Sequence, residues 1–113
     1  MNKKLQLAFE TEMICAYRAL EGGRLDHAMK HFERAHVLGQ KYVMPHVKSH
    51  WGMLRVGLKR SSFKEVWGQA VRILIGALGS AVGVVPLGNT GGTDISMFAR
   101  LPVPEDVMRL ERE

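Results

Sequence analysis

The sequence predicts an all-α protein, a compact four-helix domain followed by an irregular tail rich in glycine and proline. Apolar residues recur at helical spacing up to about residue 83, and helix-capping residues divide this part into four segments. No run alternates with a period of two for long enough to form a strand. The 113 residues, of which 46% are hydrophobic, suit one core and are too few for two. We therefore expect a single domain over residues 1–113.

The first half of this domain is predicted to be a helical hairpin over residues 1–40. Its first helix runs from Lys4 to Glu21 and ends at Gly22-Gly23, a pair typical of helix C-termini. Glu12 falls on the apolar face of this helix, so its carboxylate must be paired, exposed by a tilt of the helix, or bound to a ligand. The second helix is expected from Asp26, a favourable N-cap residue, to Leu38, just before Gly39.

Residues 45–83 are predicted to form the third and fourth helices. Pro45 suits the first turn of the third helix, which ends near Lys59. The pattern Ser62…Glu65 is a capping box, so the fourth helix begins near Phe63. The residues expected to face the core from the third helix share helical spacing and are Val47, Trp51, Leu54 and Leu58. Trp51 and Trp67 are expected to anchor the two helices to each other.

Residues 84–113 are predicted to be an irregular tail with one short helix from Glu105 to Arg112. The tail contains a glycine-rich loop, Gly88–Asp94. The loop lacks the lysine and the strand–loop–helix setting of a phosphate-binding loop, so we interpret it as a turn.

The most apolar stretch, residues 71–87, is shorter than the ~18–20 residues that a membrane span needs, and it contains three glycines and a proline. We interpret it as part of a buried central helix. Glu10 and Glu12 interrupt the N-terminal segment, which therefore does not resemble a secretory signal. These two observations favour the cytosol and give no support to membrane association.

Composition limits the partners and ligands. The net charge of +5 favours anionic partners, but aromatic residues make up only 7% and do not interleave with basic runs, so nucleic-acid binding is not indicated. Cys15 is the single cysteine, which excludes an intramolecular disulfide and a cage of thiolates around zinc. A protein partner or a homodimer remains open, because the fourth helix carries small residues such as Gly76 and Gly79 that let another backbone approach.

The first two helices resemble one tetratricopeptide repeat. The resemblance lies in Ala16, the turn Gly23–Asp26, and small residues on both sides of Phe32 at Ala28 and Ala35. The chain departs from that pattern with Glu12 and Gln40. A single unit cannot form the groove with which stacked repeats bind peptides, so the resemblance implies a way of packing two helices more than a function.

Nearly the whole chain also resembles a family of short bacterial proteins of unknown function. The most specific stretches are Glu33–Gln40, Pro45–Trp51 and Gly76–Gly83 running into Gly88–Gly92. This resemblance implies no activity, so the chemistry has to be argued from the residues.

All five histidines lie between residues 27 and 50. His27 and His31 are four residues apart on the second helix, and His46 and His50 are four apart on the third, a spacing that presents two imidazoles on one helix face. If these helices fold back on each other, His36 lies opposite His46, and His31 comes level with His50.

We therefore predict a transition-metal site formed by histidines and carboxylates, namely His31, His36, His46, His50, Glu12 and Glu33. Imidazole and carboxylate ligands without thiolates suit Zn, Fe, Ni or Cu(II), and Met53 would favour copper. His31 and His36 lie about 140° apart around their helix, which makes it harder for both to reach one ion. The role expected is metal handling or a stress response. The alternatives are a helical protein-interaction module with structural histidines and, less favoured, a metal-dependent enzyme.

Overall fold

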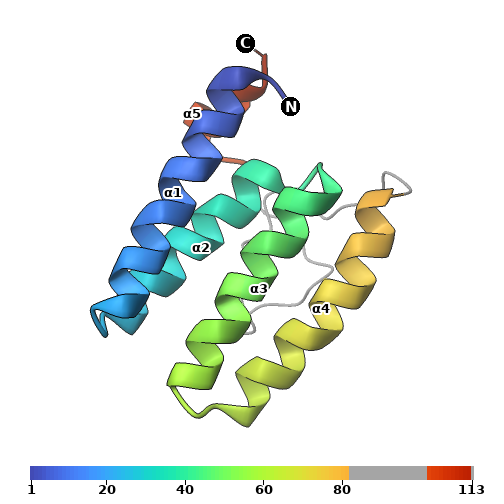
Figure 1. The fold of residues 1–113 in the computed structure, drawn as a ribbon. Helices are drawn as coiled ribbons and strands as arrows, with labels where there is room; N and C mark the ends of the chain where they lie inside the picture. The colour runs from blue at the N-terminus through green and yellow to red at the C-terminus, as the bar shows by residue number, and fades with distance from the viewer. Residues whose placement is uncertain (82–101, 113) are drawn as a thin grey trace.

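The computed structural model describes residues 1–81 and 102–112, which form α-helices and short connections without any strand. The helices are α1 (Lys3–Glu21), α2 (Leu25–Gly39), α3 (Val43–Lys59), α4 (Phe63–Ala81) and α5 (Glu105–Arg112). The prediction of four main helices and a short C-terminal one is confirmed (Figure 1). The predicted glycine-rich loop lies outside the described residues.

Local capping sets the ends of several helices. The side chain of Asn2 accepts a hydrogen bond from the backbone N–H of Leu5 (2.8 Å) at the start of α1, and Ser62 accepts one from Glu65 (3.2 Å) at the start of α4. The second of these confirms Ser62 as the predicted cap. Gly23 turns the chain between α1 and α2 at a φ of 76°, a conformation that glycine adopts without steric cost.

Helices α2 and α3 begin slightly earlier than predicted. α2 begins at Leu25 instead of Asp26, and α3 begins at Val43 instead of Pro45. Proline is tolerated at this place because the N–H groups of the first helical turn have no partner within the helix. Pro45 therefore does not mark the first residue of its helix.

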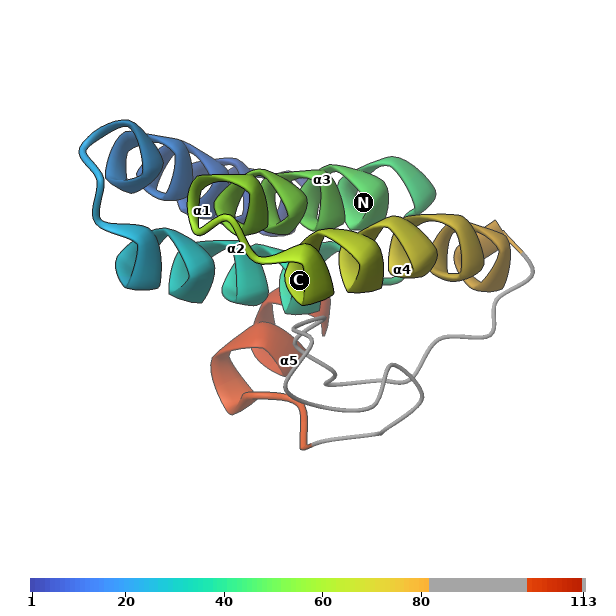
Figure 2. The same cartoon turned by 90° about the horizontal axis from the view of Figure 1, so that it is seen from below.

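The helices form two layers of two, with α5 packed beneath them (Figure 2). α1 and α2 form an antiparallel hairpin, α3 packs against α2, and α4 packs against α3 (Figure 1). The small residues Ala16, Ala28 and Ala35 are fully buried at the hairpin, and Phe32 fills the space among them, as predicted.

Helix α3 buries a different face from the one predicted. Trp51 and Leu58 are more than half exposed, while His46, His50 and Met53 lie in the core. The two sets of positions are offset by one residue, which corresponds to a rotation of about 100° around the helix. The buried face carries Gly52 beside Phe32, so α3 approaches α2 more closely than a tryptophan at the contact would allow.

Helix α4 was expected to be a buried central helix, and this expectation is wrong. The helix packs against α3 and exposes an apolar face that includes Trp67 (65% exposed), Leu74 and Leu78. The predicted anchoring role of the two tryptophans is also wrong, because both side chains are largely exposed. Within the described residues, no helix combines the length and apolarity needed to cross a bilayer.

Helix α5 returns the chain to the start of α1. Asn2 donates through Nδ2 to the carbonyl oxygen of Leu110 (2.8 Å), and Lys41 pairs with Glu111 (2.7 Å). Val107 is fully buried among residues of α1 and α2. This end of the hairpin, next to the turn into α3, is thereby fixed by contacts from a segment distant in sequence.

Candidate metal centre

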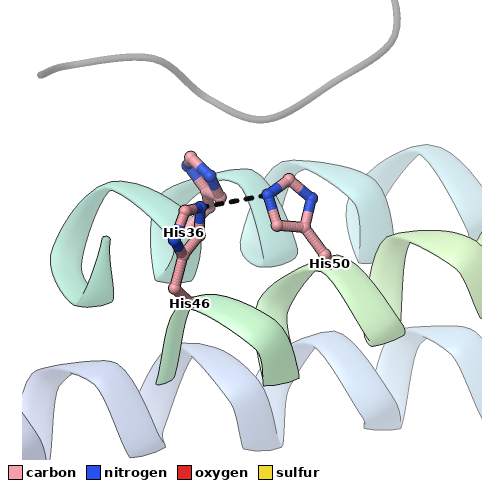
Figure 3. A group of neighbouring side chains, drawn as sticks. All are labelled: His36, His46 and His50. Carbon is pink, nitrogen blue, oxygen red and sulfur yellow. Dashed lines mark hydrogen bonds between the residues drawn. The ribbon is translucent and has the colours of Figure 1, made fainter. Parts of the chain in front are cut away.

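Three histidines from two helices meet in the interior (Figure 3). His36 lies near the C-terminal end of α2, and His46 and His50 lie one turn apart on α3. All three side chains are buried, with 3–4% of their surface exposed. The turn between α2 and α3 is short, so the end of one helix faces the beginning of the next. This topology brings His36 onto the His46–His50 pair.

The three rings are in mutual contact. Their centroids are 4.6–4.9 Å apart, and the Nε2 atoms of His46 and His50 are separated by 3.1 Å. One ring nitrogen from each histidine can be chosen so that all three lie within 4.8 Å of one another. Two nitrogens bound to zinc at about 2.0–2.1 Å in tetrahedral geometry are about 3.3 Å apart. The His46–His50 pair therefore already has nearly the spacing of two ligands, and the group could hold a metal ion.

Burial keeps two of these histidines uncharged at neutral pH. Desolvation lowers the pKa of His46 from 6.5 to about 4. Desolvation also lowers the pKa of His50 to about 4. The neighbouring His46 and Arg72 lower it as well, whereas the hydrogen bond that His50 donates to Gln69 raises it. Neutral imidazole has a lone pair on one ring nitrogen, which is the form that binds metals.

Gln69 of α4 orients the ring of His50. Its Oε1 lies 2.7 Å from Nδ1 of His50, so Nδ1 carries the proton and donates it to the amide oxygen. The amide nitrogen of Gln69 in turn donates to Sδ of Met53 (3.6 Å), which fixes the orientation of the amide. The lone pair of His50 is consequently on Nε2, the nitrogen that faces His46. Metal-bound histidines in proteins are commonly held by such a hydrogen bond at the other ring nitrogen.

Gly76 of α4 lies against the rings of His46 and His50. A Cβ atom at this position would lie 3.0 Å from Cε1 and 3.3 Å from Nε2 of His46, and 3.7 Å from Nε2 of His50. The absence of a side chain therefore lets α4 pack closely against the rings of His46 and His50.

A family model described as a protein of unknown function (DUF3703) matches residues 3–110. The chain belongs to this family. The resemblance to a family without a known activity is thereby confirmed for almost the full length. The chain matches no curated protein and no solved structure. The resemblance of α1 and α2 to a tetratricopeptide repeat stays a prediction.

Two other residues predicted as ligands, His31 and Glu12, form a separate hydrogen-bonded pair. Nδ1 of His31 lies 2.7 Å from Oε2 of Glu12, and Arg34 approaches the same carboxylate at 3.5 Å. The carboxylate on the apolar face of α1 is thus paired, which was one of the alternatives expected for it. His31 and Glu12 do not join the buried group. His31 lies five residues before His36, and this separation turns the two side chains to different faces of α2.

Glu33 and His27 also lie apart from the buried group. Among the described residues, the group that could hold an ion contains His36, His46 and His50 and no carboxylate. Glu33 is half-buried on α2, and His27 is exposed near the other end of that helix. The centre is therefore a set of three imidazoles, smaller than the mixed set predicted from the sequence.

Gln69 and Gly76 were not predicted as part of the centre. Gln69 is 1% exposed and stands as an isolated amide within the apolar sequence of α4. A buried polar residue in an apolar run needs a hydrogen-bond partner, so the sequence could have indicated that Gln69 contacts another buried polar group. For Gly76 the sequence shows only a small residue, and its role depends on which side chains of α3 face it.

Proposed function

We propose that the protein binds one divalent transition-metal ion through ring nitrogens of His36, His46 and His50. The observation that supports this most strongly is the 3.1 Å separation of two buried Nε2 atoms, with a third imidazole against both. Three buried imidazoles in contact are an unusual way to fill a core, since burying polar rings costs free energy unless their nitrogens are satisfied. A metal ion would bind one nitrogen of each of the three rings at once.

The donor set favours particular metals. Imidazole nitrogens suit Zn, Fe, Ni and Cu(II), and the near-tetrahedral spacing of His46 and His50 suits zinc best. The sulfur of Met53, which would favour copper, instead accepts a hydrogen bond from the side-chain amide of Gln69. We therefore propose zinc, or an ion of similar size and preference.

The role we propose is metal handling, by sequestration, sensing or transfer, as in a response to metal stress. The part of the chain that the structure describes offers three ligands, whereas a closed structural zinc site has four. The chain also belongs to a family whose activity is not assigned, so this role depends on the centre alone.

Metal titration of two double variants tests the proposal. The wild type, freed of metal and without a histidine tag, should bind one equivalent of Zn²⁺ or Co²⁺ by calorimetry, with a rise in melting temperature because the ion binds the native state. His46→Gln/His50→Gln should reduce the affinity at least 100-fold, because two of three ligands are removed.

His27→Gln/His31→Gln is the matched control. It removes a second pair of histidines with the same four-residue spacing, which lies outside the buried group. This control should bind metal as the wild type does. Equal metal affinity in both double variants would contradict the proposal, and so would a wild type that binds no metal while it is folded.

A second candidate function is protein interaction, and the exposed apolar face of α4 favours it. Phe63, Trp67, Leu74 and Leu78 lie on one side of this helix, and each is at least 65% exposed. Such a continuous apolar face marks an interaction surface more often than a free one. We propose a second copy of the chain as the partner, since two such faces can bury each other around a twofold axis.

A further inference from the structure

A groove with a volume of about 380 Å³ lies along α3, between α1 and α4. α3 is the middle one of these three helices and contacts both of the others (Figure 1). The residues that line the groove are Met13 and Tyr17 of α1, Val47, Lys48 and Trp51 of α3, and Ile73 of α4. The groove is therefore a different site from the histidine group and from the apolar α4 face described above.

The lining is apolar or aromatic except for one lysine. The ring of Tyr17 packs edge-on against the fully buried ring of Phe32, with the centroids 5.1 Å apart, so this wall of the groove is fixed by the core. Trp51 is 52% exposed and can bury more of its ring under a ligand. A concave apolar surface of several hundred Å³ with few polar groups is typical of sites for small molecules.

The charges at the groove favour a ligand with a negative group. Lys48 is exposed and has no ion-pair partner among the residues that the structure describes. The guanidinium of Arg55 lies over the ring of Tyr17, 5.4 Å from its centroid, and brings a second positive charge to the same wall. Helix α3 itself contains no aspartate or glutamate. An ammonium group beside an apolar surface suits a carboxylate that carries a hydrocarbon chain.

The volume of the groove limits the size of that ligand. A water molecule occupies ~30 Å³ in the liquid, so 380 Å³ corresponds to about a dozen non-hydrogen atoms. A saturated carboxylate with a chain of about ten carbons has this size.

We propose that the groove binds a medium-chain carboxylate. The hydrocarbon chain lies against Trp51 and Tyr17, and the carboxylate accepts a charge-assisted hydrogen bond from Nζ of Lys48. This binding site is independent of the metal centre, because the two share no residue.

Calorimetry with three ligands of equal chain length tests the charge preference. Decanoate, 1-decanol and decyltrimethylammonium are titrated below the concentrations at which they form micelles. We expect one decanoate per chain, bound at least tenfold more tightly than decyltrimethylammonium. Lys48→Gln should weaken decanoate binding about fivefold and leave decanol binding within twofold of the wild type. Lys64→Gln, which removes an exposed lysine outside the groove, should bind decanoate as the wild type does.

The two tryptophans of the chain show where the ligand binds. Trp67→Phe keeps only Trp51, and its fluorescence should change and saturate as decanoate is added. Trp51→Phe keeps only Trp67, which does not line the groove, so its fluorescence should stay constant. A wild type that does not bind decanoate would overturn the proposal, as would unchanged decanoate affinity in Lys48→Gln or an equal response from the two tryptophans. None of these results depends on whether the histidines bind a metal.

Discussion

The hydrogen bond between His50 and the side-chain amide of Gln69 determines which ring nitrogens of His50 and His46 carry a proton. Because Gln69 accepts the Nδ1 proton of His50, Nε2 of His50 is an acceptor, and Nε2 of His46 must be the donor across the 3.1 Å contact. A metal ion bound as proposed would take the place of that shared proton, and His46 would then carry its proton on Nδ1. Binding at neutral pH would therefore exchange a hydrogen bond for two metal–nitrogen bonds without first removing a charge from either ring.

The same buried rings make the stability of the metal-free protein depend on pH. The pKa of His46 and His50 is about 4 in the folded state and about 6.5 in the unfolded state. The unfolded state therefore binds more protons between these values, so the free energy of unfolding is highest above pH 6.5 and falls as the pH decreases toward 4. A pKa difference of this size corresponds to about 3 kcal/mol for each histidine.

Urea unfolding at a series of pH values in the presence of a chelator checks this prediction. The loss of stability between pH 6.5 and 4 should be smaller by several kcal/mol in His46→Gln/His50→Gln than in the wild type, while carboxylate titration is common to both. His27→Gln, which changes an exposed histidine, should follow the wild-type curve. Parallel curves for the wild type and the double variant would show that these rings are not held neutral by burial.

Helix α3 shows how a small residue can decide which face of a helix is buried. At Gly52, an added Cβ would lie 2.2–2.7 Å from three ring atoms of Phe32, which is fully buried and packs edge-on against Tyr17. The α2–α3 contact therefore depends on the absence of a side chain. His46 and His50 meet His36 between the same two helices, so the close packing at Gly52 helps to hold α3 against α2.

Replacing Gly52 with alanine should destabilise the fold despite the better helix propensity of alanine. We expect a loss of about 2–3 kcal/mol, the upper part of the usual range for overpacking, measured as a shift of the urea midpoint. Phe32→Leu should cost stability in the wild type, but much less when combined with Gly52→Ala, since the smaller side chain relieves the clash. Additive losses in the double variant would argue against this contact as the cause.

The arrangement of all the helices leaves α4 at an edge of the protein, with one side on α3 and an apolar side outward. The helix is about 28 Å long, from 1.5 Å per residue over its 19 residues. Its outward face is more apolar than a monomeric helix at an edge requires, and the chain carries a net charge of +5 that opposes non-specific association. Specific pairing of two copies would cover this face.

Leu74→Glu tests that pairing, and Leu7→Glu is its matched control. The two leucines have nearly equal exposure (69% and 66%), but Leu7 lies on α1, away from the α4 face. We expect the wild type to have the mass of a dimer in light scattering at micromolar concentration, Leu74→Glu to have that of a monomer, and Leu7→Glu to remain dimeric. A monomeric wild type, or equal behaviour of the two variants, would contradict a dimer through this face.

The helices and their order were predictable because their signals are local. Caps such as Ser62, breaks such as Gly22-Gly23 and apolar spacing act within one or two turns, so residues close in sequence suffice to define each helix. The same local patterns placed His36, His46 and His50 at the facing ends of two consecutive helices.

The buried faces of α3 and α4 depended on contacts between residues distant in sequence. Periodicity favoured the face with Trp51 because it is the more apolar, but the packing of Phe32 against Gly52 requires the face one residue away. On α2, a separation of five residues turns His31, which pairs with Glu12, away from His36. The packing of α4 against α3 places Gln69 and Gly76 beside the rings of α3. The sequence showed which residue types could bind a metal, whereas close packing between helices selected the three that meet, because steric fit is a property of surfaces that only the folded chain brings together.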